Sequence, residues 1–255
     1  MAASNVKGDS LRRRIVLQSK TGCSIAAVED DFHYFIVVLE HDDREVIAAY
    51  SAALRTPWSN CSQAGGLLQQ FVGLPLSTHP LRHAAAINPK LQCTHQYDLA
   101  LMAIAQASRG CRRQYDAKVP DHVSGCAQAS LERDGEACLY WTLDRTTILT
   151  PERYAGLDLR AFSSWALDDH DDDALEALLV LRRAVMISKG RGMDLDSVET
   201  ALEDLPQMAG ACFVYQPENT AAAHRNKGST IEHTQRAHEL LYDLDSQIAA
   251  LARSR

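Results

Sequence analysis

The sequence predicts an α+β protein: a twisted antiparallel sheet, arranged as a meander, with packed helices and a C-terminal helical part. Two observations lead to this fold class. Short β-branched and apolar runs follow one another about every ten residues in the first part of the chain, a spacing too short for crossover helices. Apolar residues at helical spacing then occupy the middle of the chain and return from Asp168 onward.

The predicted strands form two groups. The first group covers residues 14–18, 23–28, 33–39 and 45–50, and the turn sequences KTG, EDD and HDDR separate its members. The second group follows Gly110 and covers residues 114–119, 126–132, 137–143 and 146–149. The sequence RDGE at 133–136 predicts a hairpin turn, because Asp-Gly tolerates the positive φ angles that such a turn needs.

Two helices are predicted between the strand groups. The first covers residues 61–72, with Ser59 or Asn60 as its N-cap. The second covers residues 95–107, and Thr94 stands where an N-cap is expected. Cys93 precedes the cap, and His95, Tyr97 and Asp98 follow it within one turn. The start of this helix therefore carries most of the chemically reactive side chains of this region.

The C-terminal part is predicted to be mainly helical. Helices are expected from Asp168 onward and over residues 197–205 and 231–252. We expect residues 11–160 to form an α+β core domain and residues 161–255 to pack on it, with a single domain overall as the alternative. The last helix has an apolar stripe long enough for a partner helix, which suggests a homodimer: Leu240, Leu241, Leu244, Ile248 and Leu251.

Composition excludes several classes of partner. With 26 basic and 33 acidic residues the net charge is −7, so the positive excess of a nucleic-acid-binding protein is missing. No apolar stretch approaches the roughly 20 residues of a membrane span, and residues 1–10 lack the apolar core of a signal peptide. We therefore expect a cytoplasmic protein with no nucleic-acid or membrane partner.

The cysteines favour a reduced protein without a metal. Seven cysteines, with no CxxC pair among them, are typical of free thiols in a reducing compartment. Cys93 and His95 are the only closely spaced pair of potential zinc ligands. There is no GxSxG, GxGxxG, P-loop or HExxH motif, so we predict neither an organic cofactor nor a bound metal.

Three C-terminal segments resemble functional motifs, but a structural interpretation explains each of them more simply. The acidic run DDHDDD at 168–173 is more simply explained as the acidic start of a helix. The segment SKGRGMD at 188–194 predicts a helix end with an ion pair from Arg191 to Asp194 or Asp196. The basic segment 221–229 is expected to be an exposed loop that reaches across a dimer or closes over a pocket.

Three segments resemble successive motifs of the bacterial family known as domain of unknown function 2889. They are EDDFHYFIVVLEHD, LRTPWSNCSQAGGLLQQFVGLPL and QCTHQYDLALMAIAQA, and the resemblance covers residues 12–120. Segments like VLRRA, SKGRGMDLD and GSTIEHT also occur in longer members of the family. The chain departs from the family at Gln92, where shorter members have glycine. The resemblance implies a bacterial protein, and longer relatives accompany the catabolism of aromatic or steroid-like compounds.

If these segments converge, their polar side chains would line one pocket. The candidate catalytic residues are His33, His95, Tyr97 and Arg55: a histidine or tyrosine moves a proton, and arginine binds a carboxylate or oxyanion. The candidate substrate-binding residues are Trp58, Cys61, Cys93, Tyr50 and Tyr115. The alternatives stay open, since a histidine at a strand start can be structural, and buried cysteines commonly act as small apolar residues.

These residues predict an enzyme of lyase or isomerase type, and most directly a cofactor-independent lyase that acts on a small hydrophobic, aromatic substrate. Elimination, decarboxylation and retro-aldol cleavage each need a base, a cation for the carboxylate or oxyanion, and an apolar pocket. The alternative is a non-catalytic small-molecule binding protein or a dimeric assembly protein. A metal-dependent hydrolase is a further alternative.

Overall fold

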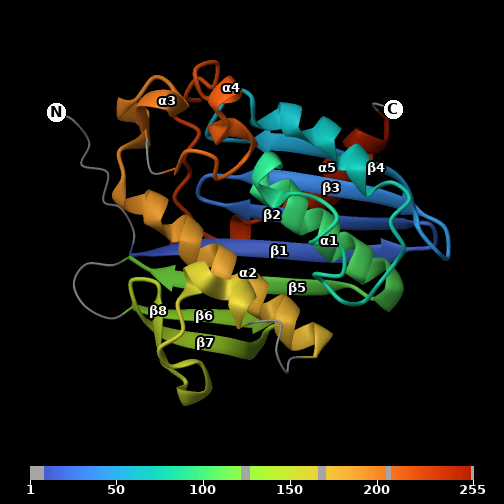
Figure 1. Cartoon of the computed structure of the whole chain (residues 1–255), viewed down its shortest axis with the longest axis horizontal. Helices are drawn as coiled ribbons and strands as arrows, with labels where there is room; N and C mark the ends of the chain where they lie inside the picture. The colour runs from blue at the N-terminus through green and yellow to red at the C-terminus, as the bar shows by residue number, and fades with distance from the viewer. Residues whose placement is uncertain (1–8, 122–126, 166–170, 205–207, 254–255) are drawn as a thin grey trace.

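The computed structural model describes residues 9–121, 127–165, 171–204 and 208–253, which form one eight-stranded antiparallel sheet with helices on both faces (Figure 1). The predicted α+β fold class is confirmed. Each predicted strand has its counterpart: β1 (Ser10–Lys20), β2 (Cys23–Asp30), β3 (Tyr34–His41), β4 (Val46–Arg55), β5 (Arg113–Pro120), β6 (Ala127–Arg133), β7 (Glu136–Asp144) and β8 (Thr147–Thr150). Asp134 and Gly135 have φ angles of 55° and 86°, as the predicted hairpin turn between β6 and β7 requires.

Two meanders make up the sheet, and they meet at its centre. The strand order is β4-β3-β2-β1-β5-β6-β7-β8, so β5 pairs with β1 and not with β4. Between β4 and β5 the chain passes through α1 (Thr94–Arg109), which packs across β3, β2 and β1. This return crossing brings the start of α1 over the same strands that carry the N-terminal motifs.

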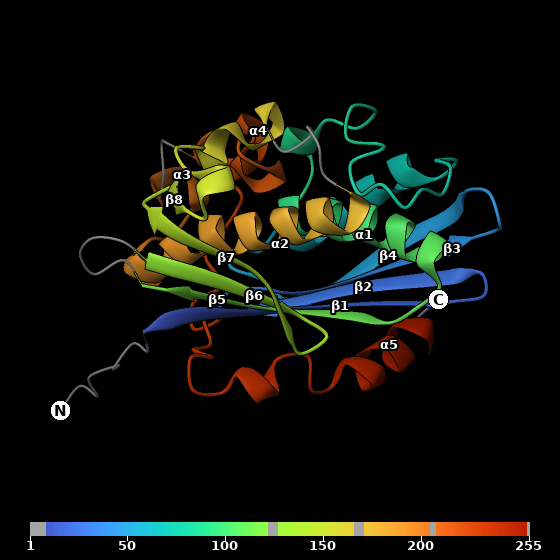
Figure 2. The ribbon, with the colours of Figure 1, turned by 90° about the horizontal axis from the view of Figure 1, so that it is seen from below.

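The main core lies between the sheet and the helices α1 and α2 (Asp172–Ser188), which cover the same face (Figure 2). It contains Leu17 and Phe35 from the strands, Ile104 from α1 and Leu181 from α2, all fully buried. Because α2 contributes to this core, the residues on both sides of the predicted boundary at 160 share one hydrophobic core.

A second core lies on the opposite face of the sheet, under α5 (Leu244–Arg253) (Figure 2). The predicted stripe of the last helix packs here: Leu241 and Leu244 are buried against the sheet, with Ile248 and Leu251 beside them. The expectation that this stripe binds a partner helix is therefore corrected, because the stripe covers the chain's own sheet.

The predicted helix 61–72 is a 3-10 helix, η1 (Cys61–Phe71). Its sequence contains Gly65 and Gly66, and glycine in a helix interior costs about 1 kcal/mol relative to alanine. A Cβ at Gly65 would lie 2.7 Å from the Oγ of Ser51 in β4. Glycine at this position lets the segment approach the edge strand β4 closely. The segment is therefore held by this packing and not by a high intrinsic helix propensity.

The helix ends also differ from the predictions. Thr94 is the first residue of α1, and the N-cap is Cys93, whose side chain makes no capping hydrogen bond. The predicted helix 197–205 is limited to the short pieces η6 (Leu195–Ser197) and α3 (Ala201–Asp204). Of the predicted helix 231–252 only α5 is α-helical, because Leu241 adopts a left-handed φ of 57° and donates its N–H to Glu29 Oε2.

The start of α2 agrees with the simpler interpretation of the acidic run. Asp171 is the N-cap, and its carboxylate accepts a hydrogen bond of 2.7 Å from the N–H of Ala174. Residues 168–170 of this run lie outside the described residues, as does Cys126 at the start of a predicted strand.

Short helical pieces complete the fold: η2 (Pro89–Leu91), η3 (Glu152–Tyr154), η4 (Leu159–Ser164), η5 (Lys189–Gly192), η8 (Phe213–Tyr215), α4 (Pro217–Thr220) and η9 (Ala237–Glu239). None of the helices in the described ranges combines the length and the apolar character that crossing a membrane requires.

Candidate functional site

The turn between β2 and β3 builds the first half of the site. Asp30 ends β2, and its Oδ1 accepts hydrogen bonds of 2.9 Å from the backbone N–H groups of Phe32 and His33. These bonds close the turn that the EDD sequence predicts. The same oxygen lies 3.0 Å from His33 Nδ1, so one carboxylate holds both the backbone and the imidazole of His33.

A buried arginine faces this carboxylate from the neighbouring strand. Arg13 pairs with Asp30 in the β1–β2 register, and its guanidinium forms an ion pair with Asp30 Oδ2. Burial opposes ionisation of Asp30, but the charges of His33 and Arg13 outweigh it and hold the pKa of Asp30 below its usual range. The carboxylate is therefore ionised, fixed in place and shared by a guanidinium and an imidazole.

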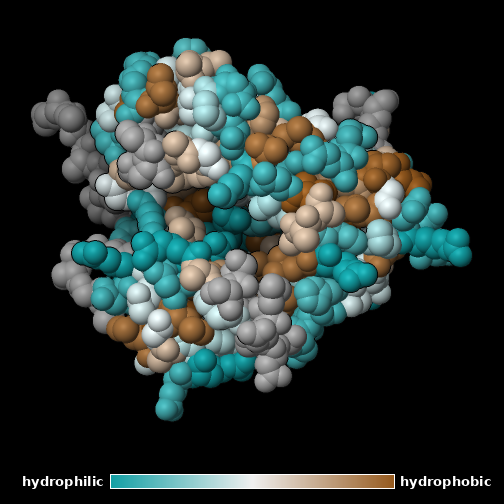
Figure 3. Space-filling model, in the orientation of Figure 1, coloured by the Kyte–Doolittle hydropathy of each residue, from teal (hydrophilic) through white to brown (hydrophobic). Residues whose placement is uncertain are grey.

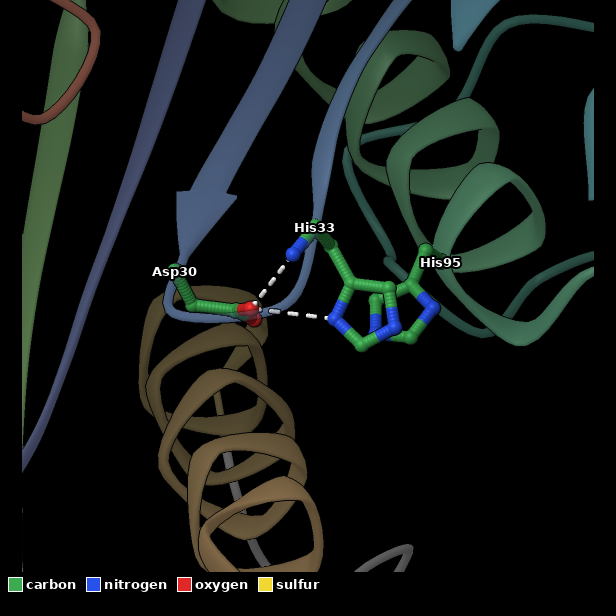
Figure 4. Close-up of side chains that lie close together, drawn as sticks. All are labelled: Asp30, His33 and His95. Atoms are coloured by element: carbon green, nitrogen blue, oxygen red, sulfur yellow. Dashed lines mark hydrogen bonds and ion pairs between the residues drawn. The ribbon is translucent and has the colours of Figure 1, made fainter. Parts of the chain in front are cut away.

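His95, in the first turn of α1, completes the cluster (Figure 4). Its ring stacks on that of His33 with the centroids 3.8 Å apart, and Phe35 lies 5.6 Å from it. Burial, followed by the positive charges of His33 and Arg13, lowers the pKa of His95 well below the usual value. The imidazole is thus neutral, and its buried Nε2 has no hydrogen-bond partner among the described residues.

Two kinds of chemistry fit this arrangement. Asp30 is ionised and can only accept hydrogen bonds, so Nδ1 of His33 donates to it, and in the neutral imidazole Nε2 is the nitrogen with the lone pair. This tautomer is that of a general base oriented by a carboxylate. Asp30, His33 and His95 also offer ligand atoms that all lie within 4.8 Å of one another, a donor set suited to zinc or iron.

Of the four candidate catalytic residues, His33 and His95 are brought together, and they are 8% and 6% exposed. Tyr97 lies two residues further along α1 and therefore points to another side of the helix. Its ring packs against Phe71 with the centroids 5.8 Å apart, and burial raises its pKa to about 12. The expected place of Tyr97 beside the imidazoles is therefore corrected.

Arg55 lies on the opposite face of the sheet, which corrects the expectation that it shares a pocket with the histidines. Along β4, Ala53 pairs with Phe35, and continuing this register would place Arg55 opposite His33. A bulge between these pairs makes Arg55 pair with Tyr34 instead, and one extra residue reverses the face of a side chain. Its guanidinium there donates to Glu29 Oε1 at 3.0 Å and to the carbonyl oxygen of Asp30 at 2.6 Å.

Two of the expected substrate-binding tyrosines also lie elsewhere. Tyr50 pairs with Val38 and packs in the second core, on the face of α5. Tyr115 is fully buried beneath α2, where its hydroxyl donates to Glu176 Oε1 at 2.8 Å. Burial, followed by the charge of Glu176, raises the pKa of Tyr115. Neither tyrosine contributes to the cluster around His33.

Trp58, Cys61 and Cys93 are buried near the start of α1. The Trp58 ring meets that of Tyr215 edge to face, with the centroids 6.2 Å apart. Burial raises the pKa of the Cys61 thiol well above its usual value and that of Cys93 to about 12. Both thiols are therefore protonated, and in this structure they act as small apolar residues.

Arg13 and Asp30 belong to the cluster but were not predicted from the sequence. A signal for both was present, because a tight hairpin at Thr21 and Gly22 sets Arg13 opposite Asp30. The ion pair of Arg183 with Asp98, with Nε 2.6 Å from Oδ2, was missed as well. The charge of Arg183 contributes to the lowered pKa of His95 and so acts on the site.

A pocket of about 770 Å³ adjoins the turn. Its walls come from Asp31 and Phe32, from residues 190–196 and from residues 228–236. The Phe32 ring lines the pocket and meets the His33 ring edge to face at 6.0 Å, so one aromatic ring separates the two features. The molecular surface is hollowed beside α2, on the face that α1 and α2 cover (Figure 3).

Arg191 lines one side of this pocket, and its ion pairs differ from the predicted one. Its partners are Asp31, Asp121 and Glu232, and not Asp194 or Asp196. Burial raises the pKa of Asp31 to about 7 although the charge of Arg191 opposes this shift.

The segment 221–229 is less exposed than predicted. Arg225 is 7% exposed and donates to Asp196 Oδ1 at 2.9 Å and to the carbonyl oxygen of Pro57 at 2.8 Å. These bonds hold the loop against the chain.

No protein-family model matches the chain, and no curated protein matches it either. The resemblance to the domain of unknown function 2889 family stays a prediction.

Proposed function

We propose that the chain is a lyase that acts on a small hydrophobic, aromatic substrate by acid/base catalysis, without an organic cofactor. The observation that carries this proposal is the 3.0 Å hydrogen bond between His33 Nδ1 and Asp30 Oδ1. A carboxylate that fixes the tautomer of an imidazole turns its second nitrogen toward the substrate as a base. The His33 side chain retains 10% of its accessible surface.

The charges around His33 support proton transfer. When His33 accepts a proton, the ionised Asp30 stabilises the imidazolium that forms. The stacked His95 ring stays neutral, because its pKa lies well below the usual value, and it therefore adds no like charge. Phe32 and Phe35 lie 6.0 Å from the His33 ring, and such apolar neighbours exclude water from the base.

The proposed mechanism also needs a cation for the substrate's carboxylate or oxyanion. Arg55, which was expected to supply this cation, lies on the other face of the sheet. We assign the role to Arg183, which pairs with Asp98, three residues after His95 in α1, and whose side chain is 19% accessible. Its guanidinium has five donors, and Asp98 accepts from two of its nitrogens, so donors remain for a ligand.

A substrate screen with matched variants tests the proposal. Aromatic hydroxy acids, keto acids and alcohols are incubated with the protein, and products are detected by absorbance and mass spectrometry. We expect a pH-dependent reaction whose rate falls roughly 10²–10⁴-fold in His33→Gln, the usual contribution of a general base. His41→Gln is the control, because this histidine is equally buried, 8% exposed, but lies at the far end of β3.

Two results would contradict the proposal. Equal rates in His33→Gln and the unsubstituted protein would remove His33 from the reaction. Saturable binding of a compound without any product would favour the alternative of a non-catalytic small-molecule binding protein.

A metal-dependent hydrolase is the second candidate, favoured by the three ligand atoms within 4.8 Å and by the unpaired Nε2 of His95. An ion bound there would supply a Lewis acid. The ring arrangement weighs against this candidate: the two imidazole planes are stacked at 29°, whereas shared ligation needs lone pairs that converge on one point. Titration with Co²⁺ separates the candidates, because ligand-field absorption that disappears in His95→Phe would favour the hydrolase.

A further inference from the structure

The pocket beside the turn has the size and the walls of a small-molecule site. Its volume of about 770 Å³ falls within the usual range for ligand pockets. Apolar side chains from three separate segments line it: Phe32, Met193, Leu195 and Ile231. Ile231 is 36% exposed, so its side chain is open to a ligand in the pocket.

The wall that faces the catalytic cluster is rigidly built. A Cβ at Gly190 would lie 3.2 Å from the tip of the Phe32 ring, so the ring rests directly on the glycine backbone. Phe32 is itself 5% exposed. A ligand in the pocket would contact Phe32, and the His33 imidazole lies against the same ring, 6.0 Å away.

The charges of the lining residues decide which ligand fits. Four carboxylates line the pocket and only two guanidinium groups do: Asp31, Asp194, Asp196 and Glu232, against Arg191 and Arg236. Arg191 is shared among Asp31, Glu232 and Asp121, the last of which lies outside the lining. Arg191 pairs with Asp31 and Arg225 pairs with Asp196, so the carboxylate of Asp194 is left without an ion pair among the described residues, and its charge attracts a cation.

The carboxylate of Asp194 is the group best placed to receive that cation. It is exposed at the pocket, and within the described part of the chain it has no ion pair and no side-chain hydrogen bond. By contrast, Asp196 is paired with Arg225 and also accepts from the N–H of Gly228 at 2.9 Å.

We propose that this pocket binds a small organic cation that carries an ammonium group on an apolar body. Asp194 is the counter-ion of the ammonium group, and the apolar side chains of the wall pack against the body. The inference goes beyond the proposed function, since it rests on the shape and charge of the pocket and not on catalysis at His33. An organic cation fits this pocket better than a metal ion does, because a hydrated metal ion gains no stabilisation from the apolar wall.

Calorimetric titration of the full chain tests the inference. Benzylamine and hexylamine are the probes, and benzyl alcohol, hexanol and benzoate are their neutral and anionic counterparts. We expect saturable binding of the amines, weaker binding of the alcohols and none of benzoate. Binding should weaken as NaCl rises, because salt screens the exposed carboxylate.

Variants locate the site. Asp194→Asn should weaken amine binding about two- to fivefold, the usual range for an exposed ion pair, and Asp194→Lys should weaken it further. Asp43→Asn is the matched control, since this exposed aspartate lies in the turn beyond the far end of β3. His33→Gln should bind the amines unchanged, which separates this inference from the proposed lyase activity.

Three outcomes would overturn the inference. They are equal affinity for amines and alcohols, no saturable amine binding, and amine binding that is unchanged in both Asp194 variants. Binding of Mg²⁺ or Ca²⁺ alone that is lost in Asp194→Asn, without amine binding, would overturn the ligand class.

Discussion

Replacing His95 with phenylalanine is expected to stabilise the protein while removing a residue of the candidate site. The His95 imidazole is 6% exposed, and its Nε2 has no hydrogen-bond partner among the described residues. Burying an unsatisfied polar group costs about 1–3 kcal/mol, and phenylalanine removes this cost. The slightly larger ring strains a site already filled by His33 and Phe35, which offsets part of this gain, so we expect a net gain of up to about 1 kcal/mol at pH 7.5.

The gain should grow in acid. The pKa of His95 in the folded protein lies well below the usual value of 6.5, mainly because of burial. As the pH falls below 6.5, the unfolded chain binds a proton at His95 and the folded chain does not, so the unsubstituted protein loses stability. Phenylalanine has no such proton, and its advantage should widen by about 1 kcal/mol between pH 7.5 and pH 5.5.

Urea unfolding followed by tryptophan fluorescence measures both effects. His41→Phe is the control with the opposite expected sign, because His41 has partners for both ring nitrogens, Ser24 Oγ at 3.1 Å and the carbonyl oxygen of Asp42 at 3.0 Å. Losing these bonds should destabilise by about 1–3 kcal/mol. A His95→Phe variant that is destabilised by more than about 1 kcal/mol at pH 7.5 would refute the reasoning, because Nε2 must then have a partner such as a water or a metal ion.

Two further predictions concern the turn and the C-terminal helix. Burial raises the pKa of Asp31 from 3.8 to about 7, so the folded protein should lose stability relative to Asp31→Asn as the pH rises from 5 to 8. The difference should change by about 2–3 kcal/mol, and a constant difference in urea unfolding would contradict this. Leu244→Ala should destabilise by about 2–5 kcal/mol, because this buried side chain packs on the second face of the sheet. Light scattering should give the same oligomeric state before and after this substitution, and dissociation of a dimer would contradict the packing of α5 on its own sheet.

The strands were predictable because their signal is local. Apolar and β-branched runs separated by turn residues specify where each strand lies, and all eight have counterparts in the sheet. The joining of the two meanders through β1 and β5 was not predictable in this way, because it depends on contacts between residues about 100 positions apart. The predicted helix lengths in the C-terminal part were wrong for a related reason. Tertiary hydrogen bonds, such as that from the N–H of Leu241 to Glu29, override local helix propensity.

The sequence by itself determined which side chains could do chemistry near the turn and the start of α1, since turn and helix signals locate His33 and His95. Only the tertiary structure decided which of them meet. Arg13 joins Asp30 through strand register, and a single bulge in β4 sends Arg55 to the opposite face. A strand alternates its faces with every residue, so one inserted residue, invisible in the local pattern, reverses the side on which a group can act.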